Sequence, residues 1–102
     1  MTIFQLECYY ALAQSLNFTQ TASQQYITQP ALSRSISSLE KELGRKLVER
    51  SSRGLRITPY GETVRDYAKV ILKHASLISS MATHHNGKKF TLATYPSNMI
   101  TN

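Results

Sequence analysis

Residues 28–44 read TQPALSRSISSLEKELG, and this stretch carries the signals of a complete helix. Thr28 has a side-chain oxygen that can cap a helix start, and Pro30 suits a first helical turn because it lacks an N–H and fixes φ. Gly44 is the residue type that most often follows a helix in the left-handed conformation. Between these signals, apolar residues recur at steps of four, three and four. They predict one buried stripe, formed by Leu32, Ile36, Leu39 and Leu43.

The opposite face of this predicted helix is short and polar. It consists of Ser33, Arg34, Ser37, Ser38 and Lys41. A helix that enters the major groove of DNA needs small residues for close approach, an amide for adenine, an apolar edge for a thymine methyl, and an arginine for phosphate or guanine. Gln29, then Pro30 or Ala31, and then Arg34 fit these roles in turn. For the helix taken alone, a solvated polar face is the alternative.

Two further helices are predicted before residue 28. Thr2 and Gln5 stand at the spacing of a capping box, which predicts the start of the first helix. Asn17 or Thr19 can cap a second, short helix that runs through Gln25. A short helix followed closely by another with a proline-bearing cap has the outline of a helix-turn-helix. The first helix has a stripe predicted to be buried, formed by Leu6, Tyr9 or Tyr10, and Ala13.

A hairpin is predicted after the third helix. Residues 47–49 and 55–57 are short apolar-rich runs on either side of RSSRG at residues 50–54. This narrow turn has Arg50, Arg53 and Arg56 on or beside it, where an arginine can enter a minor groove or clamp a phosphate. A solvated surface turn is the alternative, but the order of helix, turn, helix and basic hairpin favours DNA binding.

A long helix is predicted next. Thr58 and Pro59 repeat the cap-then-proline pattern, and the helix should end near Met81 or Thr83. Its apolar positions have the spacing of three heptads of a and d positions. We interpret this heptad seam as a homodimer contact, because so small a core cannot cover so long a helix. Packing within its own domain is the alternative. The seam consists of Val64, Ala68, Ile71, Ala75, Ile78 and Ala82.

The composition is consistent with an anionic partner, and a soluble basic domain without such a partner is the alternative. The 102 residues have a net charge of +6, and residues 28–60 alone hold seven Lys and Arg against three Glu. Such an excess attracts polyanions. An enzyme is not expected, because no Gly-rich phosphate loop is present and Cys8 has no histidine nearby in the sequence, so that it fits a core position better than a nucleophile. His84 and His85 lack further ligands nearby for a metal shell. Neither a signal peptide nor a membrane span is expected, which predicts a cytoplasmic protein.

In this order, the motifs resemble the N-terminal DNA-binding region of the LysR-type transcriptional regulators. The resemblance covers residues 1 to about 85. It rests on Phe18-Thr19, Gln29-Pro30-Ala31-Leu32-Ser33-Arg34, Leu39-Glu40, Leu43-Gly44 and Arg53-Gly54. It implies a mainly α fold, a winged helix-turn-helix with three helices and a short two-stranded β wing, followed by a long dimerising linker helix. Tyr26 stands where the family usually has leucine, and we expect it to alter core packing.

The resemblance also implies an organisation in domains. Residues 1–58 would form the winged domain, with the helix-turn-helix at about 18–37, and residues 59–85 the linker helix. Residues 86–102, with strand-like alternation at Phe90–Tyr95, would be a hinge and the first strand of a truncated effector-binding domain. No cofactor is implied for this fragment, but a small-molecule effector is implied for the missing domain. The DNA-facing set by position is Thr19, Thr28, Gln29, Pro30, Ala31, Ser33, Arg34, Arg50 and Arg53.

We therefore predict a sequence-specific DNA-binding transcription regulator that acts as a dimer on a pseudo-palindromic site. Its partners would be double-stranded DNA and a second copy of the chain, with a dimer or a tetramer in the full-length protein. The alternative is a coiled-coil protein-interaction module without specific DNA binding. A membrane-surface helix ranks third, because the long helix has a narrow Ala/Ile seam instead of basic and aromatic faces.

Overall fold

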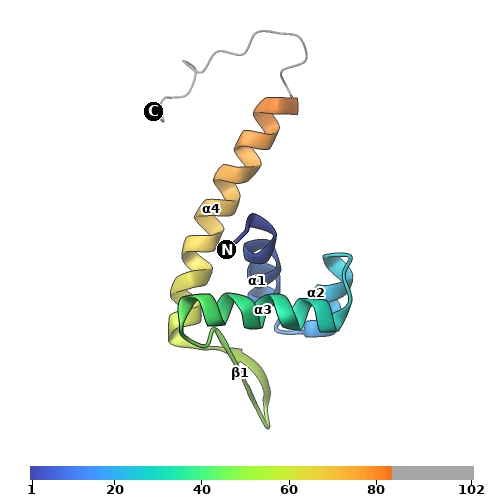
Figure 1. Ribbon diagram of the computed structural model, residues 1–102, viewed down its shortest axis with the longest axis vertical. Helices are drawn as coiled ribbons and strands as arrows, with labels where there is room; N and C mark the ends of the chain where they lie inside the picture. Colours follow the sequence, from blue (N-terminus) through green and yellow to red (C-terminus); the bar gives the residue numbers. More distant parts are fainter. Residues whose placement is uncertain (84–102) are drawn as a thin grey trace.

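The computed structural model describes residues 1–83, which form four helices and one two-stranded hairpin. The elements in chain order are α1 (Ile3–Ser15), α2 (Phe18–Gln24), α3 (Gln29–Leu43), β1 (Val48–Ser51), β2 (Gly54–Ile57) and α4 (Pro59–Thr83). The predicted mainly α, winged helix-turn-helix fold is confirmed (Figure 1). The expectations for His84, His85 and the strand at Phe90–Tyr95 fall outside the described residues.

The first three helices begin at caps that the sequence supplies. Thr2 and Gln5 exchange two hydrogen bonds of 3.0 Å, which completes the predicted capping box. Asn17, and not Thr19, caps α2 by accepting from the backbone N–H three residues on at 2.8 Å. Thr28 caps α3 in the same way at 3.2 Å. These side-chain oxygens satisfy N–H groups that have no partner within the helix, and so they fix where each helix starts.

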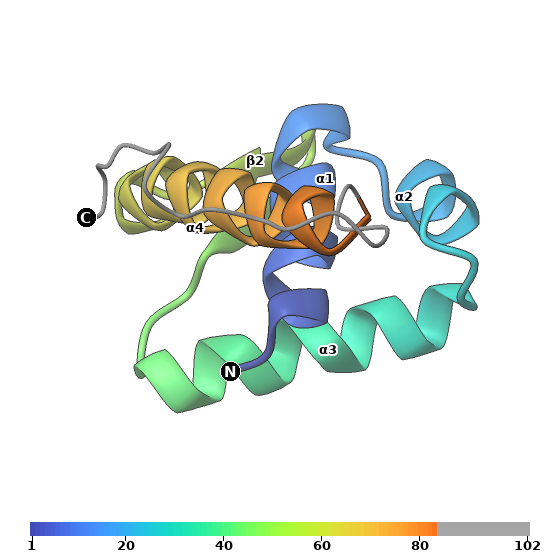
Figure 2. The ribbon, with the colours of Figure 1, turned by 90° about the horizontal axis from the view of Figure 1, so that it is seen from above.

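The core is built around α1, which contacts all three other helices (Figure 2). Leu6, Tyr9 and Ala13 are buried as predicted, and Tyr9 rather than Tyr10 is the fully buried tyrosine. Cys8 is also fully buried, which confirms its core position. Burial and the neighbouring Glu7 carboxylate raise the pKa of the Cys8 thiol, so that it stays protonated and packs as a small apolar side chain.

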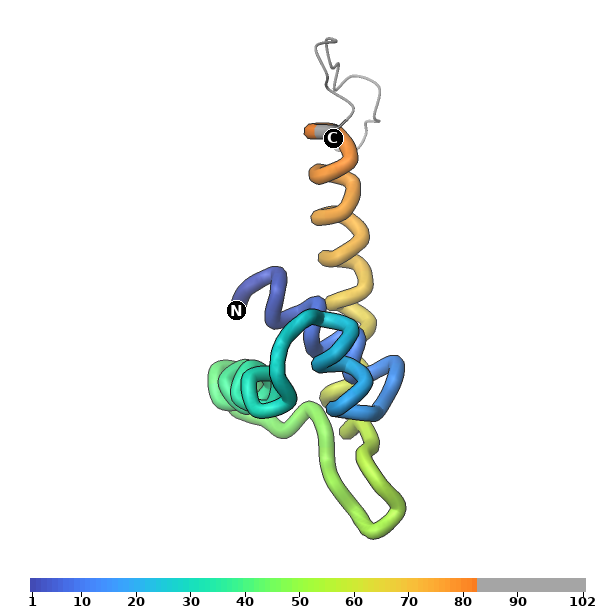
Figure 3. The backbone as a smooth tube through the Cα atoms, turned by 90° about the vertical axis from the view of Figure 1, so that its right-hand side faces the viewer, coloured from blue at the N-terminus to red at the C-terminus, as the bar shows by residue number. Residues whose placement is uncertain are grey.

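The β1–β2 hairpin, which we call the wing, extends away from the helices. Its register pairs Val48 with Ile57 and Ser51 with Gly54, so that residues 52–53 form the loop at its tip. The first strand begins one residue later than predicted, because the Leu47 N–H donates to the Glu40 carboxylate and not to the second strand. The wing and the far end of α4 lie at opposite ends of the described part of the molecule (Figure 3).

A small network joins the root of the wing to α4 and α1. The Thr58 hydroxyl donates to the Lys46 carbonyl at 2.8 Å and accepts from the Gly61 N–H at 2.9 Å. The Tyr9 hydroxyl donates to the Gly61 carbonyl at 2.7 Å. A Cβ atom on Gly61 would collide with the backbone carbonyl of Leu47. Glycine is therefore the residue that allows α4 to begin in direct contact with the wing root.

The expectation for Tyr26 is wrong, because its side chain is 94% exposed. The turn between α2 and α3 is closed by hydrogen bonds from the Tyr26 and Ile27 N–H groups to the carbonyls of Ser23 and Ala22. This closure leaves Tyr26 with a left-handed backbone, at φ 57°, and an outward side chain. The neighbouring Ile27 packs against the core instead.

The heptad seam of α4 divides between two environments. Val64 and Ala68 pack against the core of their own domain, and Ala68 is only 1% exposed. The expectation that Ala68 forms a dimer contact is therefore corrected, since its surface is already covered. Val64 is only partly buried, and its role in a dimer stays a prediction. Ile71 and Ile78, farther along α4, remain 40% and 66% exposed. Ala75, between them, is half-buried.

Candidate nucleic-acid interface

The exposed side of α3 is the polar side that the sequence predicts. Leu32, Ile36 and Leu39 are buried in the core, and this fixes the rotation of the helix about its axis. The residues between them then face outward. A shallow groove along this side is lined by Pro30, Ser33, Arg34, Ser37, Ser38 and Lys41. Small hydroxyl side chains in the middle of the groove leave space for close approach of a ligand.

Eight of the nine predicted DNA-facing residues have exposed side chains, and Ala31 is half-buried. They come from three parts of the fold. Thr19 lies in the first turn of α2, residues 28–34 form the start of α3, and the two arginines lie on the wing. Arg50 is on strand β1, whereas Arg53 is in the loop at the wing tip.

The starts of α2 and α3 are joined by one exposed hydrogen bond. The Thr19 hydroxyl donates to the side-chain carbonyl oxygen of Gln29 at 3.2 Å. This bond restricts the rotation of the Gln29 side chain at the start of α3. An amide held in this way can pair with adenine with less loss of side-chain entropy.

The tip of the wing is ordered by a serine. Ser51 accepts a hydrogen bond from the Arg53 N–H at 3.1 Å and donates to the Gly54 carbonyl at 3.2 Å. Gly54 has φ 111°, a conformation that side chains rarely allow. The result is a narrow two-residue loop that presents Arg53 at its end.

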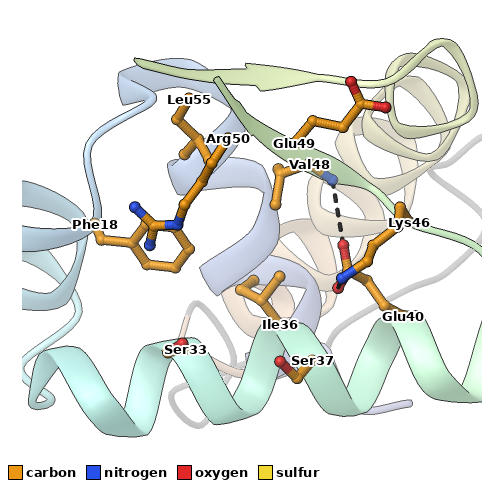
Figure 4. Close-up of a pocket in the computed structure, with 10 residues that line it drawn as sticks. All are labelled: Phe18, Ser33, Ile36, Ser37, Glu40, Lys46, Val48, Glu49, Arg50 and Leu55. Carbon is orange, nitrogen blue, oxygen red and sulfur yellow. Dashed lines mark hydrogen bonds and ion pairs between the residues drawn. The ribbon is translucent and has the colours of Figure 1, made fainter. Parts of the chain in front are cut away.

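A cleft of about 440 Å³ separates α3 from the wing (Figure 4). On the α3 side, the Glu40 carboxylate accepts hydrogen bonds from the N–H groups of Leu47 and Val48 at 2.8 and 3.2 Å. On the wing side, the Arg50 guanidinium lies over the Phe18 ring, 4.9 Å from its centroid. These contacts connect the wing to α3 and to α2.

Positive charge on this side of the molecule is largely unpaired. Lys46 lies 3.7 Å from Glu40, and Arg56 lies 3.2 Å from Glu49. Within residues 1–83, no carboxylate forms an ion pair with Arg34, Lys41, Arg50 or Arg53. A surface with several uncompensated cations attracts a polyanion and speeds its approach.

Residues 1–83 contain no group of three or more His, Cys, Asp or Glu side chains that could hold a metal ion. No helix described in the structure has the length and apolar character needed to cross a membrane.

Residues 3–62 match the protein family described as "Bacterial regulatory helix-turn-helix protein, lysR family". The chain belongs to the LysR family. Among curated relatives, the HTH-type transcriptional regulator TfdT of Cupriavidus pinatubonensis is 39% identical over 72 residues, which are 71% of this chain and 32% of TfdT. The chain thus spans about a third of the length of this relative.

Solved structures of LysR-type regulators have the same fold. A crystal structure of the BenM DNA-binding domain in complex with catB site 1 DNA matches with a TM-score of 0.77 at 34% identity, covering 92% of this chain and 97% of that one. Full-length OxyR C199D of Pseudomonas aeruginosa matches with a TM-score of 0.80 at 35% identity, covering 84% of this chain and 29% of that one. The LysR chain described here therefore contains a winged helix-turn-helix DNA-binding domain. None of these matches supports the alternative of a protein-interaction module.

Several surface features of this LysR-family domain were not predicted. Phe18 and Ser37 line the cleft beside the wing. Tyr67, Val70 and Leu77 are exposed on α4, together with Ile71 and Ile78. The apolar residues of α4 recur with a helical period beside the heptad seam, so that the sequence does contain a signal for them. The contact between Phe18 and Arg50 has no local sequence signal.

Proposed function

We propose that this chain is the DNA-reading part of a transcription regulator that binds a pseudo-palindromic site as a homodimer and catalyses no reaction. The outer side of α3 enters the major groove, where Gln29 and Arg34 contact bases and Thr28, Pro30, Ala31 and Ser33 allow close approach. Arg50 contacts a phosphate, Thr19 faces the DNA while its hydroxyl keeps its hydrogen bond to Gln29, and Arg53 enters the minor groove from the wing tip.

One observation carries this proposal. The side of α3 that has no role in the core has small hydroxyl side chains and unpaired cations, and the wing beside it presents a further arginine at its tip. In Figure 1, the wing projects from below α3, away from the far end of α4. An α-helix fits a major groove and a narrow hairpin fits beside it, so that one duplex can contact both elements.

The dimer is proposed to form along α4. Its exposed apolar residues lie three, four or seven positions apart and so share one side of the helix, where they form an apolar stripe of Tyr67, Val70, Ile71, Leu77 and Ile78. The second half of α4 stands clear of the other helices (Figure 1). Exposed apolar side chains gathered on one side of a helix are typical of a protein–protein contact. We infer that the occupant is a second copy, with Ala75 at the margin of the contact.

The remaining assignments concern the whole protein. We propose that residues 1–58 are the DNA-binding domain, 59–85 the linker helix, and 86–102 the beginning of an effector-binding domain. The chain spans about a third of the length of TfdT, and we propose that the full-length protein also contains a domain that binds a small-molecule effector. We further propose that it acts in the cytoplasm and forms a dimer or a tetramer.

Selection of duplexes from a random pool by the 102-residue chain tests the proposal. The expected product contains two inverted half-sites whose centres are one helical turn, about 34 Å, or a multiple of it apart. Gel-shift titration should then show tighter binding to the selected duplex than to a scrambled one at the same salt concentration. Enrichment of a lone half-site would contradict the dimer, and no enrichment at all would contradict sequence-specific binding.

A further inference from the structure

We infer that Phe18 is a positioning residue for DNA binding: its ring holds the Arg50 guanidinium in the cleft between α3 and the wing, where a phosphate of the DNA backbone passes. The inference rests on the proposed function and extends it. It assigns one phosphate contact to Arg50. It also gives a role in that contact to Phe18, an aromatic residue that is not among the predicted DNA-facing residues.

The first argument is geometric. Phe18 begins α2 and is half-buried against the core, so that its ring is held in place. Arg50 comes from β1, and its guanidinium carbon lies 4.9 Å from the centroid of that ring. The two side chains meet in the cleft (Figure 4). An arginine over an aromatic face is attracted by the ring quadrupole and loses part of its rotamer freedom before any ligand arrives.

The second argument concerns charge. Two carboxylates also line this cleft, but each has partners. Glu40 accepts from two backbone N–H groups and lies near Lys46, and Glu49 pairs with Arg56 at 3.2 Å. Among residues 1–83, Arg50 has no carboxylate partner. Its charge is therefore oriented by the ring without being neutralised.

The third argument concerns the path of the DNA. When α3 lies in a major groove and the wing tip lies in the adjacent minor groove, the strand between the two grooves must pass across the cleft. The hydroxyls of Ser33 and Ser37 line the α3 side of this cleft, and Arg50 lies opposite them. Hydroxyl and guanidinium groups are the usual protein donors to phosphate oxygens.

A double-mutant cycle on the selected duplex tests the inference with the 102-residue chain. Phe18→Leu keeps an apolar side chain and removes the ring, and Arg50→Ala removes the cation. We expect Phe18→Leu to weaken binding about two- to five-fold in the wild-type background and to have no effect in the Arg50→Ala background. Arg50→Ala should also reduce the slope of log K against log salt by about one.

Matched variants separate positioning from general packing. Phe18→Tyr keeps the ring face and should bind as the wild type does. Trifluorophenylalanine at position 18 keeps the shape but weakens the ring quadrupole, and it should reproduce the loss seen with Phe18→Leu even if that variant is unstable. Arg53 lies in the loop at the wing tip and not over the Phe18 ring, so that Phe18→Leu should weaken binding by the same factor in an Arg53→Ala background as in the wild type.

Three results would overturn the inference. One is that Phe18→Leu weakens DNA binding by the same factor in the wild-type and Arg50→Ala backgrounds. Another is unchanged affinity with the fluorinated ring. The third is an Arg50→Ala variant with an unchanged salt slope. If the wild-type chain binds no duplex at all, the proposed function fails as well, whereas specific binding by the wild type with an additive cycle overturns this inference alone.

Discussion

The hydroxyl of Tyr9 donates a hydrogen bond of 2.7 Å to the carbonyl oxygen of Gly61, 52 positions later in the chain. The bond joins the middle of α1 to the first turn of α4, at the point where α4 also contacts the backbone of Leu47 at the wing root. One buried hydroxyl thus connects the centre of the core with the start of the linker helix and the base of the wing.

Tyr9→Phe removes this hydroxyl and leaves the ring in place. The free energy of unfolding should fall by about 1 kcal/mol, because one buried hydrogen bond is lost without a change in packing. Urea denaturation at neutral pH measures the change. Tyr10→Phe, a substitution of the neighbouring half-buried tyrosine, is the matched control and should have a smaller effect.

The same pair of variants tests how the free energy of unfolding depends on pH. Burial raises the pKa of Tyr9 to about 12. Since this is above the ordinary tyrosine value near 10, the folded state holds the phenol proton more tightly than the unfolded state does. This contribution to stability is complete below about pH 10 and is lost as the pH rises toward 12. Tyr9→Phe should lack that loss of stability and Tyr10→Phe should retain it. If the free energy of unfolding varies with pH in the same way in both variants, the loss does not come from Tyr9.

Glu40 should control how firmly the wing is held to α3. Its carboxylate accepts from the N–H groups of Leu47 and Val48, and its side chain is only 11% exposed. Glu40→Ala should lower the free energy of unfolding by about 1–3 kcal/mol, because two amides lose their acceptor. Hydrogen exchange measured by NMR should be faster at both amides.

Two further variants test which part of the Glu40 interaction matters. Glu40→Gln keeps one acceptor oxygen, and its free energy of unfolding should lie between those of Glu40→Ala and the wild type. Lys46→Met removes only a 3.7 Å ion pair whose lysine is 77% exposed, and it should change stability by less than about 0.5 kcal/mol. A Lys46 variant as damaging as Glu40→Ala would show that the ion pair, and not the backbone contacts, holds the wing.

Gln29 and Arg53 should contribute to DNA binding in different ways. Gln29→Ala is expected to weaken binding to the selected site by about 1–3 kcal/mol and to leave binding to scrambled DNA almost unchanged, because base contacts carry sequence information. Arg53→Ala should weaken binding to both duplexes and reduce the salt slope. Gel-shift titrations over a range of salt concentrations separate the two patterns. A loss with Gln29→Ala that is the same on both duplexes would show that Gln29 reads no base.

The apolar stripe on α4 should govern self-association. Ile78→Glu places a charge on a residue that is 66% exposed in the single chain, and it should dissociate the dimer in sedimentation experiments while the domain stays folded. Ser76→Glu adds the same charge to an exposed residue away from the stripe and should leave the dimer intact. Ala68→Glu, in contrast, should unfold the domain, because Ala68 is buried in the core. A monomeric Ser76→Glu variant would argue against this surface.

The sequence predicts best those features whose causes are local. Helix caps at Thr2, Asn17 and Thr28 are interactions over three residues, and the buried stripe of α3 repeats within one helix. The environments of Tyr26 and Ala68 depend instead on which elements pack together. Apolar character alone does not distinguish a core contact from an exposed one, so that Tyr26 was expected to affect the core and Ala68 to form a dimer contact.

The candidate site shows the same division. The exposure of Gln29 and Arg34 follows from the helical period once Leu32 is placed in the core. The contact between Phe18 and Arg50 depends on where the wing lies relative to the start of α2. Neither residue type nor spacing indicates that contact.

Because Gly61 has no side chain, the first turn of α4 lies directly against the Leu47 backbone, and this contact sets the direction in which the helix leaves the domain. The helix extends for 25 residues from its first turn, or about 37 Å, so that a tilt of about 5° at the base displaces the far end by about 3 Å. In two chains that are joined beyond this point, the same tilt would change the separation of their recognition helices. In the proposed dimer, the distance between half-sites that the protein tolerates would then depend on the close contact at Gly61, which a residue with a Cβ atom could not make.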